Sequence, residues 1–231
     1  MADRKTPASK PLKAEFHPLT PDRWADFEIL FGPRGACGGC WCMAWRLPRK
    51  DWEASKGDGN RRLMHDIVRS SERPPGILAY VDGTPVGWCA IAPRQVYVAL
   101  ERSRVLKPVD DQPVWSITCF FIHKDHRRQG LSTALINAAV EFAARSGAKI
   151  VEGYPVEPYT PNIPAAFAWT GLPAAFLKAG FTEVVRRSKT RPIVRRIVGR
   201  QSRATPRSTA NKPDAKTANA NQPRRPKRRT R

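Results

Sequence analysis

Residues 114–133 constrain the fold of this chain more than any other segment. An apolar run, Val114–Ile122, is followed by a basic turn that contains Gly130, and the turn leads into an amphipathic stretch from Leu131. This pattern predicts a buried strand, a tight turn and a helix. The first N–H groups of a helix lack partners within the helix, and its dipole favours negative charge there, so we expect the turn to bind phosphate.

Periodicity predicts the remaining elements of one α/β domain. Strands are expected at 14–19, 76–81, 86–92, 115–122, 150–156, 181–187 and 193–198, and helices at 21–31, 61–69, 131–146 and 171–179. Asp82-Gly83 indicates a hairpin, and Trp88 and Trp115 are expected in the core. The strand–helix–strand unit that starts at residue 115 is expected to be parallel and right-handed.

The charge of the chain is uneven, which divides it into three parts. The net charge is +21, and residues 200–231 contribute eleven Lys/Arg against one acid. With four prolines and no aromatic residue, 199–231 is predicted to be a disordered basic tail. Residues 1–12 are a polar leader, and 13–198 form the domain.

Composition also predicts the compartment. The first ten residues have no apolar run, and no window is apolar enough for a membrane span. Five cysteines, an odd number spread along the chain, favour reduced thiols over a disulfide framework. We therefore expect a cytoplasmic protein without membrane contact.

The segment Arg127–Ser132 resembles the acyl-CoA motif Gln/Arg-x-x-Gly-x-Gly/Ala of the GNAT superfamily of acetyl-CoA-dependent N-acetyltransferases, with Ser132 where Gly or Ala is usual. Gly180-Phe181 before a strand is also common there, and the likeness covers most of 13–198. It implies an α/β fold with a GNAT-like mixed, mostly antiparallel central sheet flanked by helices.

The resemblance also implies the cofactor site. Acetyl-CoA would be the co-substrate, and strand 119–122 resembles the splayed strand that pairs with its pantetheine arm. The residues expected to bind it are Phe121, Ile122, Arg127, Arg128, Gln129, Gly130, Leu131, Ser132 and Thr133. Backbone N–H groups would meet the pyrophosphate, and arginines would add charge-assisted contacts.

The catalytic groups are predicted on the next strand. Transfer to an amine needs a base for the ammonium and an acid for the leaving thiolate. Glu152 and Tyr154 alternate on one strand face and are the predicted catalytic residues, against the alternative of a paired strand carboxylate and a packing tyrosine. Thr170 lies where family members often place a tyrosine, but it is rather expected to cap the last helix.

The loop at 31–46 is the second unusual feature. Cys37-Gly-Gly-Cys40-Trp-Cys42 resembles a bacterial branch of GNAT-like proteins, and the loop is expected to form part of the acceptor wall. Three thiols fall short of the four ligands of a structural zinc site, so no metal is expected. Metal binding, with His65 as a fourth ligand, a redox pair Cys37–Cys40 and simple core packing remain the alternatives.

The leading hypothesis is direct transfer of an acetyl group, in a ternary complex, to a small-molecule or peptide amine. Two alternatives stand beside it. One is a nucleic-acid-associated protein whose tail contacts phosphates without sequence preference, and the other is a GNAT domain that binds acyl-CoA without turnover. Edge strands near the C-terminus would allow a homodimer.

Overall fold

A computed structural model describes residues 13–160 and 164–199. The strands are β1 (Ala14–Pro18), β2 (Gly76–Val81), β3 (Thr84–Pro93), β4 (Trp115–Ile122), β5 (Ile150–Gly153), β6 (Thr182–Arg186) and β7 (Pro192–Ile197). The α-helices are α1 (Trp24–Phe31), α2 (Arg49–Ala54), α3 (Asp58–Ser70), α4 (Val98–Glu101), α5 (Leu131–Arg145) and α6 (Pro173–Lys178). The predicted leader 1–12 and all of the predicted tail except Gly199 lie outside the described residues.

All seven strands form one sheet in the order β1-β2-β3-β4-β5-β7-β6. Neighbouring strands are antiparallel except for β4 and β5, which are parallel as predicted for the strand–helix–strand unit. The predicted α/β fold, with a mixed and mostly antiparallel sheet flanked by helices, is confirmed.

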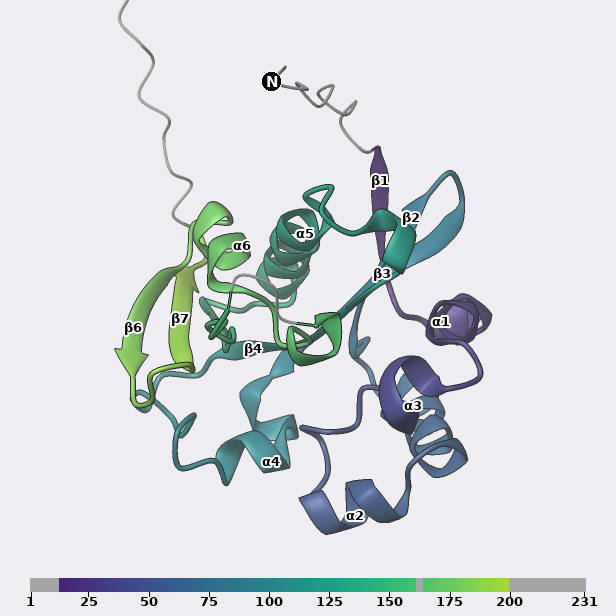
Figure 1. Ribbon diagram of the computed structural model, residues 1–231, viewed down its shortest axis with the longest axis horizontal. Coiled ribbons are helices and arrows are strands. Elements are labelled where there is room, and N and C mark those ends of the chain that lie inside the picture. The colour runs from purple at the N-terminus through teal and green to yellow at the C-terminus, as the bar shows by residue number, and fades with distance from the viewer. Residues whose placement is uncertain (1–12, 161–163, 200–231) are drawn as a thin grey trace, which may run out of the picture. The chain divides into compact units, whose positions relative to one another are not determined.

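Helices cover both faces of the sheet (Figure 1). On one face, α5 and α6 pack on a cluster that includes Ile117, Leu135 and Phe176. On the other face, α1 and α3 pack on a cluster that includes Phe27 and Trp88. The strands β2, β3 and β4 therefore carry apolar side chains on both faces, as their near-continuous apolar sequences require.

The hairpin between β2 and β3 shows how local sequence fixes the sheet. Asp82 and Gly83 both have positive φ, 48° and 74°, which matches the right-handed twist of the strands that they join. Trp88 is fully buried, and Trp115 is 8% exposed, so both predicted core positions are confirmed. Among the described residues, no helix has the length and apolar character needed to cross a membrane.

Candidate functional site

The start of α5 is an open, basic turn. Arg127, Arg128, Gln129 and Gly130 are all exposed, and Gly130 adopts a left-handed φ of 80° directly before the helix. No side chain of the described part of the chain caps this helix. The first N–H groups of α5 are thus free for an external acceptor, as the sequence predicted for a phosphate site.

Arg127 is oriented toward this turn by the strand that precedes it. Its Nε donates to the carbonyl oxygen of Ile122, the last residue of β4, at 2.9 Å. Gln129 similarly donates from Nε2 to the carbonyl oxygen of Asp125 at 2.9 Å. These two bonds fix the turn and leave the terminal nitrogens of the Arg127 guanidinium facing outward, where a phosphate could accept from them.

β4 and β5 separate along the second half of β4, the half that leads into this turn. They pair over three residues only, ending with Ile117 opposite Gly153, although the sequence predicted the strand to run to Val156. Gly153 has no room for a side chain, because an added Cβ would lie 2.3 Å from Phe176 Cε1. Beyond Ile117, the backbone of β4 therefore forms no ladder with β5.

The gap between the two strands is bridged by residues 169–171. The N–H of Phe120 donates to the carbonyl oxygen of Trp169 at 2.6 Å, and the N–H of Val156 donates to Gly171 at 3.0 Å. Thr170 is buried and accepts from Arg191 at 3.1 Å, whereas the residue before α6 is Leu172. The expectation that Thr170 caps α6 was therefore wrong, because its hydroxyl binds Arg191 and Leu172 stands at the cap position.

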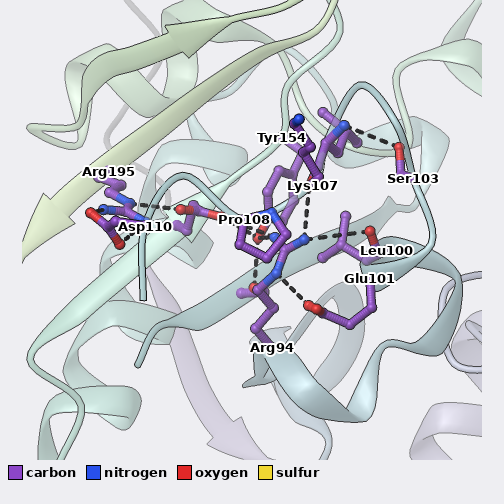
Figure 2. A network of polar contacts seen from close by, with 12 residues as sticks. Arg94, Leu100, Glu101, Ser103, Lys107, Pro108, Asp110, Tyr154 and Arg195 are labelled. Atoms are coloured by element: carbon purple, nitrogen blue, oxygen red, sulfur yellow. Dashed lines mark hydrogen bonds and ion pairs between the residues drawn. The ribbon is translucent and has the colours of Figure 1, made fainter. Parts of the chain in front are cut away.

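Glu152 and Tyr154 lie together in a buried polar network at the base of the divergence. Figure 2 shows Tyr154 with Arg94 and Arg195 in this network. Glu152 accepts from the Tyr154 hydroxyl at 2.6 Å, from Arg195 Nε at 2.6 Å and from Arg94 Nη1 at 3.1 Å. Ser116, its register partner on β4, lies 2.7 Å from the Tyr154 hydroxyl. The Glu152 carboxylate is fully buried and neutralised by two arginines.

The arginines extend this network outward. Arg94 forms an ion pair with Glu101 and donates to the Leu106 carbonyl at 2.7 Å, and Arg195 binds both oxygens of Asp110 at 2.7 and 3.0 Å. A cavity of about 230 Å³ adjoins this outer rim.

Burial raises the pKa of Tyr154 well above its usual value, and the neighbouring Glu152 charge adds to the effect. Tyr154 thus stays protonated near neutral pH.

A second set of polar groups lies on the α1–α3 side of β4. The Tyr97 hydroxyl, the Thr118 hydroxyl and the Trp45 indole N–H are buried without a hydrogen-bond partner among the described residues. Tyr97 and Thr118 are each 1% exposed, and burial raises the pKa of Tyr97 to about 12. Sequence reasoning missed Tyr97 and Thr118, because a tyrosine and a threonine in apolar segments carry no distinguishing signal.

The predicted acceptor loop packs close to these groups. The Arg46 guanidinium lies 4.9 Å from the centre of the Tyr97 ring, and the Trp45 ring lies 5.6 Å from that of Trp169. The described residues contain no group of three or more His, Cys, Asp or Glu side chains arranged to hold a metal ion. The loop therefore contributes aromatic and cationic side chains to the face of β4 where the strands diverge.

No curated protein matches the sequence. The chain is similar, at low identity, to three solved structures: the PaiA N-acetyltransferase of Thermoplasma acidophilum in complex with coenzyme A (13% identity, TM-score 0.46, 80% of this chain and 99% of that chain), a GNAT-family acetyltransferase of Streptococcus agalactiae (14%, 0.48, 80% and 95%) and the ribosomal-protein-S18-alanine N-acetyltransferase of Escherichia coli (13%, 0.42, 80% and 94%).

The sequence itself carries the family signature. Residues 41–166, more than half of the chain, match the acetyltransferase (GNAT) family. The matched region runs from the cysteine-rich loop through β4 and the start of α5 to the segment beyond β5. The chain therefore belongs to the GNAT family of acetyltransferases.

Proposed function

We propose that the protein transfers an acetyl group from acetyl-CoA to an amine by direct attack in a ternary complex. The observation that carries this proposal is the open turn at the start of α5, with free N–H groups beside Arg127 and Arg128. Backbone N–H groups from Arg128 to Thr133 would bind the pyrophosphate, where the helix dipole also favours negative charge. Gln129, Gly130, Leu131 and Ser132 lie within this run.

The divergence of β4 and β5 supports the position of the pantetheine arm. Phe121 and Ile122 are the last two residues of β4, and we propose that they lie beside the thioester. In the structure, the Phe120 N–H is held by the carbonyl oxygen of Trp169. An arm that pairs with β4 as an extra strand would need that donor, so acetyl-CoA binding should compete with the 169–171 bridge.

The acceptor amine would approach from the α1–α3 side of β4. There the unpartnered hydroxyls of Tyr97 and Thr118 can bind polar groups of a substrate, because a buried polar atom without a partner gains a full hydrogen bond from a ligand. With a pKa of about 12, Tyr97 is protonated at neutral pH and can donate a proton to a leaving thiolate. Small-molecule and peptide amines both remain candidate acceptors.

Glu152 and Tyr154 stay the predicted base and acid, and their contacts favour a different role. A carboxylate that already binds two arginines and a phenol has few free lone pairs for an incoming ammonium. The network instead joins β4, β5 and β7 where β4 and β5 separate. We propose that the pair holds the divergence open and acts as a positioning element.

Calorimetric titration of the full-length protein with acetyl-CoA tests the proposal. We expect micromolar binding, because phosphate and pantetheine contacts together supply several kcal/mol. Arg127→Ala should weaken binding roughly 10-fold by removing a charge-assisted contact. Arg145→Ala, an exposed arginine at the other end of α5, is the matched control and should bind normally.

The same samples test catalysis. Incubation with acetyl-CoA and pooled amines, followed by mass spectrometry, should show an acetylated amine and free CoA. Absence of acetyl-CoA binding at about 100 μM would refute the proposal as a whole. Binding without any acetylated product would instead favour the alternative of an acyl-CoA-binding domain without turnover.

The division of the chain is part of the proposal. Domain 13–198 would hold the whole acetyl-CoA site, and the basic tail 199–231 would act separately, through non-specific contact with nucleic acid. Deletion of residues 200–231 should therefore leave acetyl-CoA affinity unchanged. If the deletion removes that affinity, the tail contributes to the site.

A further inference from the structure

Two thiols meet on the α1–α3 face of the sheet, outside the groups used above. Cys42 ends the cysteine-rich loop and is 6% exposed, and Cys119 lies on β4 next to Phe120 and is half-buried. Cys42 belongs to the apolar cluster around Trp88, Cys119 packs against that cluster, and a contact between the two thiols contributes to the pKa of each. Cys119 lies 77 positions after Cys42, so only the fold brings them together.

The surroundings of Cys42 favour its thiolate. The indole Nε1 of Trp88 donates to the Cys42 sulfur at 3.2 Å, and an indole nitrogen can only donate, so the sulfur must accept. The Cys119 thiol, the largest effect, and the Trp88 bond lower the pKa of Cys42 against burial, with a smaller contribution from the Arg46 charge. The pKa of Cys119 is raised by the same contact and by burial.

The backbone of the loop is strained in a way that holds Cys42 at the sheet. Trp41 and Cys42 have φ values of 44° and 62°, a region that costs a non-glycine residue about 1–2 kcal/mol. The Trp41 indole packs directly against Gly35, where an added Cβ would lie 2.3 Å from the indole Nε1. Packing of Trp41 thus offsets the strain and fixes the Cys42 sulfur against Trp88.

The other three cysteines lack this combination. Cys37 is exposed, and Cys89 is fully buried with a pKa raised well above the usual value by burial. Burial also raises the pKa of Cys40, and the neighbouring Cys42 adds to the effect. Cys42 and Cys119 thus combine a stabilised thiolate, which is the nucleophile in thiol oxidation, with a protonated thiol beside it, and the half-buried Cys119 gives the pair its access to solvent.

We propose that Cys42 and Cys119 form a redox-active thiol pair that a hydroperoxide converts to a disulfide. The Cys42 thiolate attacks the terminal peroxide oxygen, the O–O bond breaks, and the departing oxygen takes a proton, leaving a sulfenic acid on Cys42 and water or an alcohol in solution. The Cys119 sulfur then attacks the Cys42 sulfur, its proton and the sulfenic hydroxyl leave as water, and the S–S bond forms. Both thiols are oxidised, and the peroxide is reduced by two electrons.

The disulfide would affect the site of the proposed function, on which this consequence rests. It would tie the cysteine-rich loop to β4 at the residue next to Phe120, whose N–H faces the gap between β4 and β5. Acetyl transfer should therefore slow at least several-fold on oxidation and recover with dithiothreitol.

The test counts thiols and does not depend on acetyl transfer. The full-length reduced protein is treated with hydrogen peroxide, its remaining thiols are alkylated, and the intact protein and its peptides are analysed by mass spectrometry. We expect the treated protein to lose two hydrogen atoms, two of the five thiols to resist alkylation, and one cross-linked peptide pair to contain Cys42 and Cys119. Dithiothreitol should restore all five.

Variants give the matched controls. Cys119→Ser should abolish the cross-link and leave Cys42 as a sulfenic acid that dimedone labels, whereas Cys37→Ser and Cys89→Ser should leave the cross-link unchanged. The proposal is wrong if all five thiols survive peroxide, or if the cross-link joins Cys37 to Cys40. Because the readout is mass alone, a protein that fails to bind acetyl-CoA but forms this disulfide would overturn only the proposed function.

Discussion

Two arginine-rich regions flank the divergence of β4 and β5, and they differ in what their polar groups already bind. At the start of α5, arginines and free N–H groups are exposed, and few of them have partners. Around Glu152, Arg94 is buried and Arg195 is half-buried, and nearly every polar atom is paired. The first region can therefore bind a charged ligand, whereas the second is suited to holding strands together.

The difference shows that residue type alone does not assign a role. Glu152 and Tyr154 were predicted as catalytic because of their position on a strand beside the cofactor site. The structure places them where β4 and β5 diverge, with every strong partner supplied by the protein. A catalytic group needs capacity left over for the substrate, which the unpartnered Tyr97 and Thr118 hydroxyls have.

The largest expected effect is the loss of Glu152. Glu152→Ala removes the fully buried carboxylate that Arg94 and Arg195 share and leaves each arginine with one carboxylate at the more exposed rim, so the free energy of unfolding should fall by about 3 kcal/mol. Urea unfolding followed by circular dichroism measures this. The matched control is Glu183→Ala, because Glu183 pairs with Arg186 at the surface and should cost less than about 1 kcal/mol.

The same variant can also show that the network around Glu152 is not structural. If Glu152→Ala unfolds at the same urea concentration as the wild type and loses turnover, then Glu152 is the base that the sequence predicted and the network is not structural. Tyr154→Phe gives a second measure: a positioning role lowers stability with kcat largely retained, whereas a proton donor lowers kcat with stability retained.

The next largest effect should be a loss of stability at alkaline pH, through the buried phenols of Tyr97 and Tyr154. Burial raises the pKa of Tyr97 to about 12, from a usual value of 10.0. Below pH 10 both the folded and the unfolded protein keep this proton, and the stabilisation is fully present. Between pH 10 and 12 the unfolded state releases it first, so the free energy of unfolding should fall by about 1.4 kcal/mol per pH unit.

Urea unfolding at a series of pH values measures that slope. Tyr97→Phe should make it shallower by the contribution of one phenol, and Tyr154→Phe should do the same, since burial also raises the pKa of Tyr154. An unchanged slope in both variants would mean that these phenols ionise at the same pH in the folded and the unfolded protein.

Some of this arrangement could be predicted from the sequence because local pattern determines it. The apolar run 115–122 matches β4 residue for residue, and the Asp82-Gly83 turn fixed the β2–β3 hairpin. The short helices α2 and α4 were missed, because segments of six and four residues carry too little periodicity.

The network could not be predicted, because its members are far apart in the chain. Arg94 lies 58 residues before Glu152, and Arg195 lies 43 residues after it, so nothing local connects them. The end of β5 at Gly153 is also set by tertiary packing against Phe176. Sequence pattern thus identified the open turn, whose geometry is local, and missed the closed network, whose geometry is not.

Substitution of Gly130 can separate acetyl-CoA binding from protein stability at the open turn. Gly130→Ala and Gly147→Ala, at the two ends of α5, both place alanine at a positive φ with open space around the new Cβ, 80° and 87° respectively. Each should therefore lower the free energy of unfolding by about 1 kcal/mol. Only Gly130→Ala should also weaken acetyl-CoA binding, by roughly 3- to 10-fold, because it shifts the N–H groups of the turn.

Isothermal titration and urea unfolding of both variants give the two readouts. Equal losses of acetyl-CoA affinity in the two variants would show that binding responds to the stability of α5 as a whole. The start of the helix would then have no special role, and the contrast between the open and the closed region would lose its main support.

The smallest expected effect concerns the bridge that joins the two regions. Trp169→Ala removes the ring that packs 5.6 Å from Trp45 and leaves the backbone carbonyl that accepts from Phe120. An aromatic pair of this kind contributes about 0.5–1.5 kcal/mol, so the bridge should yield more readily to acetyl-CoA, and affinity should rise roughly 3-fold. Phe167→Ala, an exposed ring in the same segment, is the control and should leave affinity unchanged. Weaker binding by Trp169→Ala would contradict the proposed competition between acetyl-CoA and the 169–171 bridge. Trp169 would then be a contact for acetyl-CoA, and the bridge would belong to the open region.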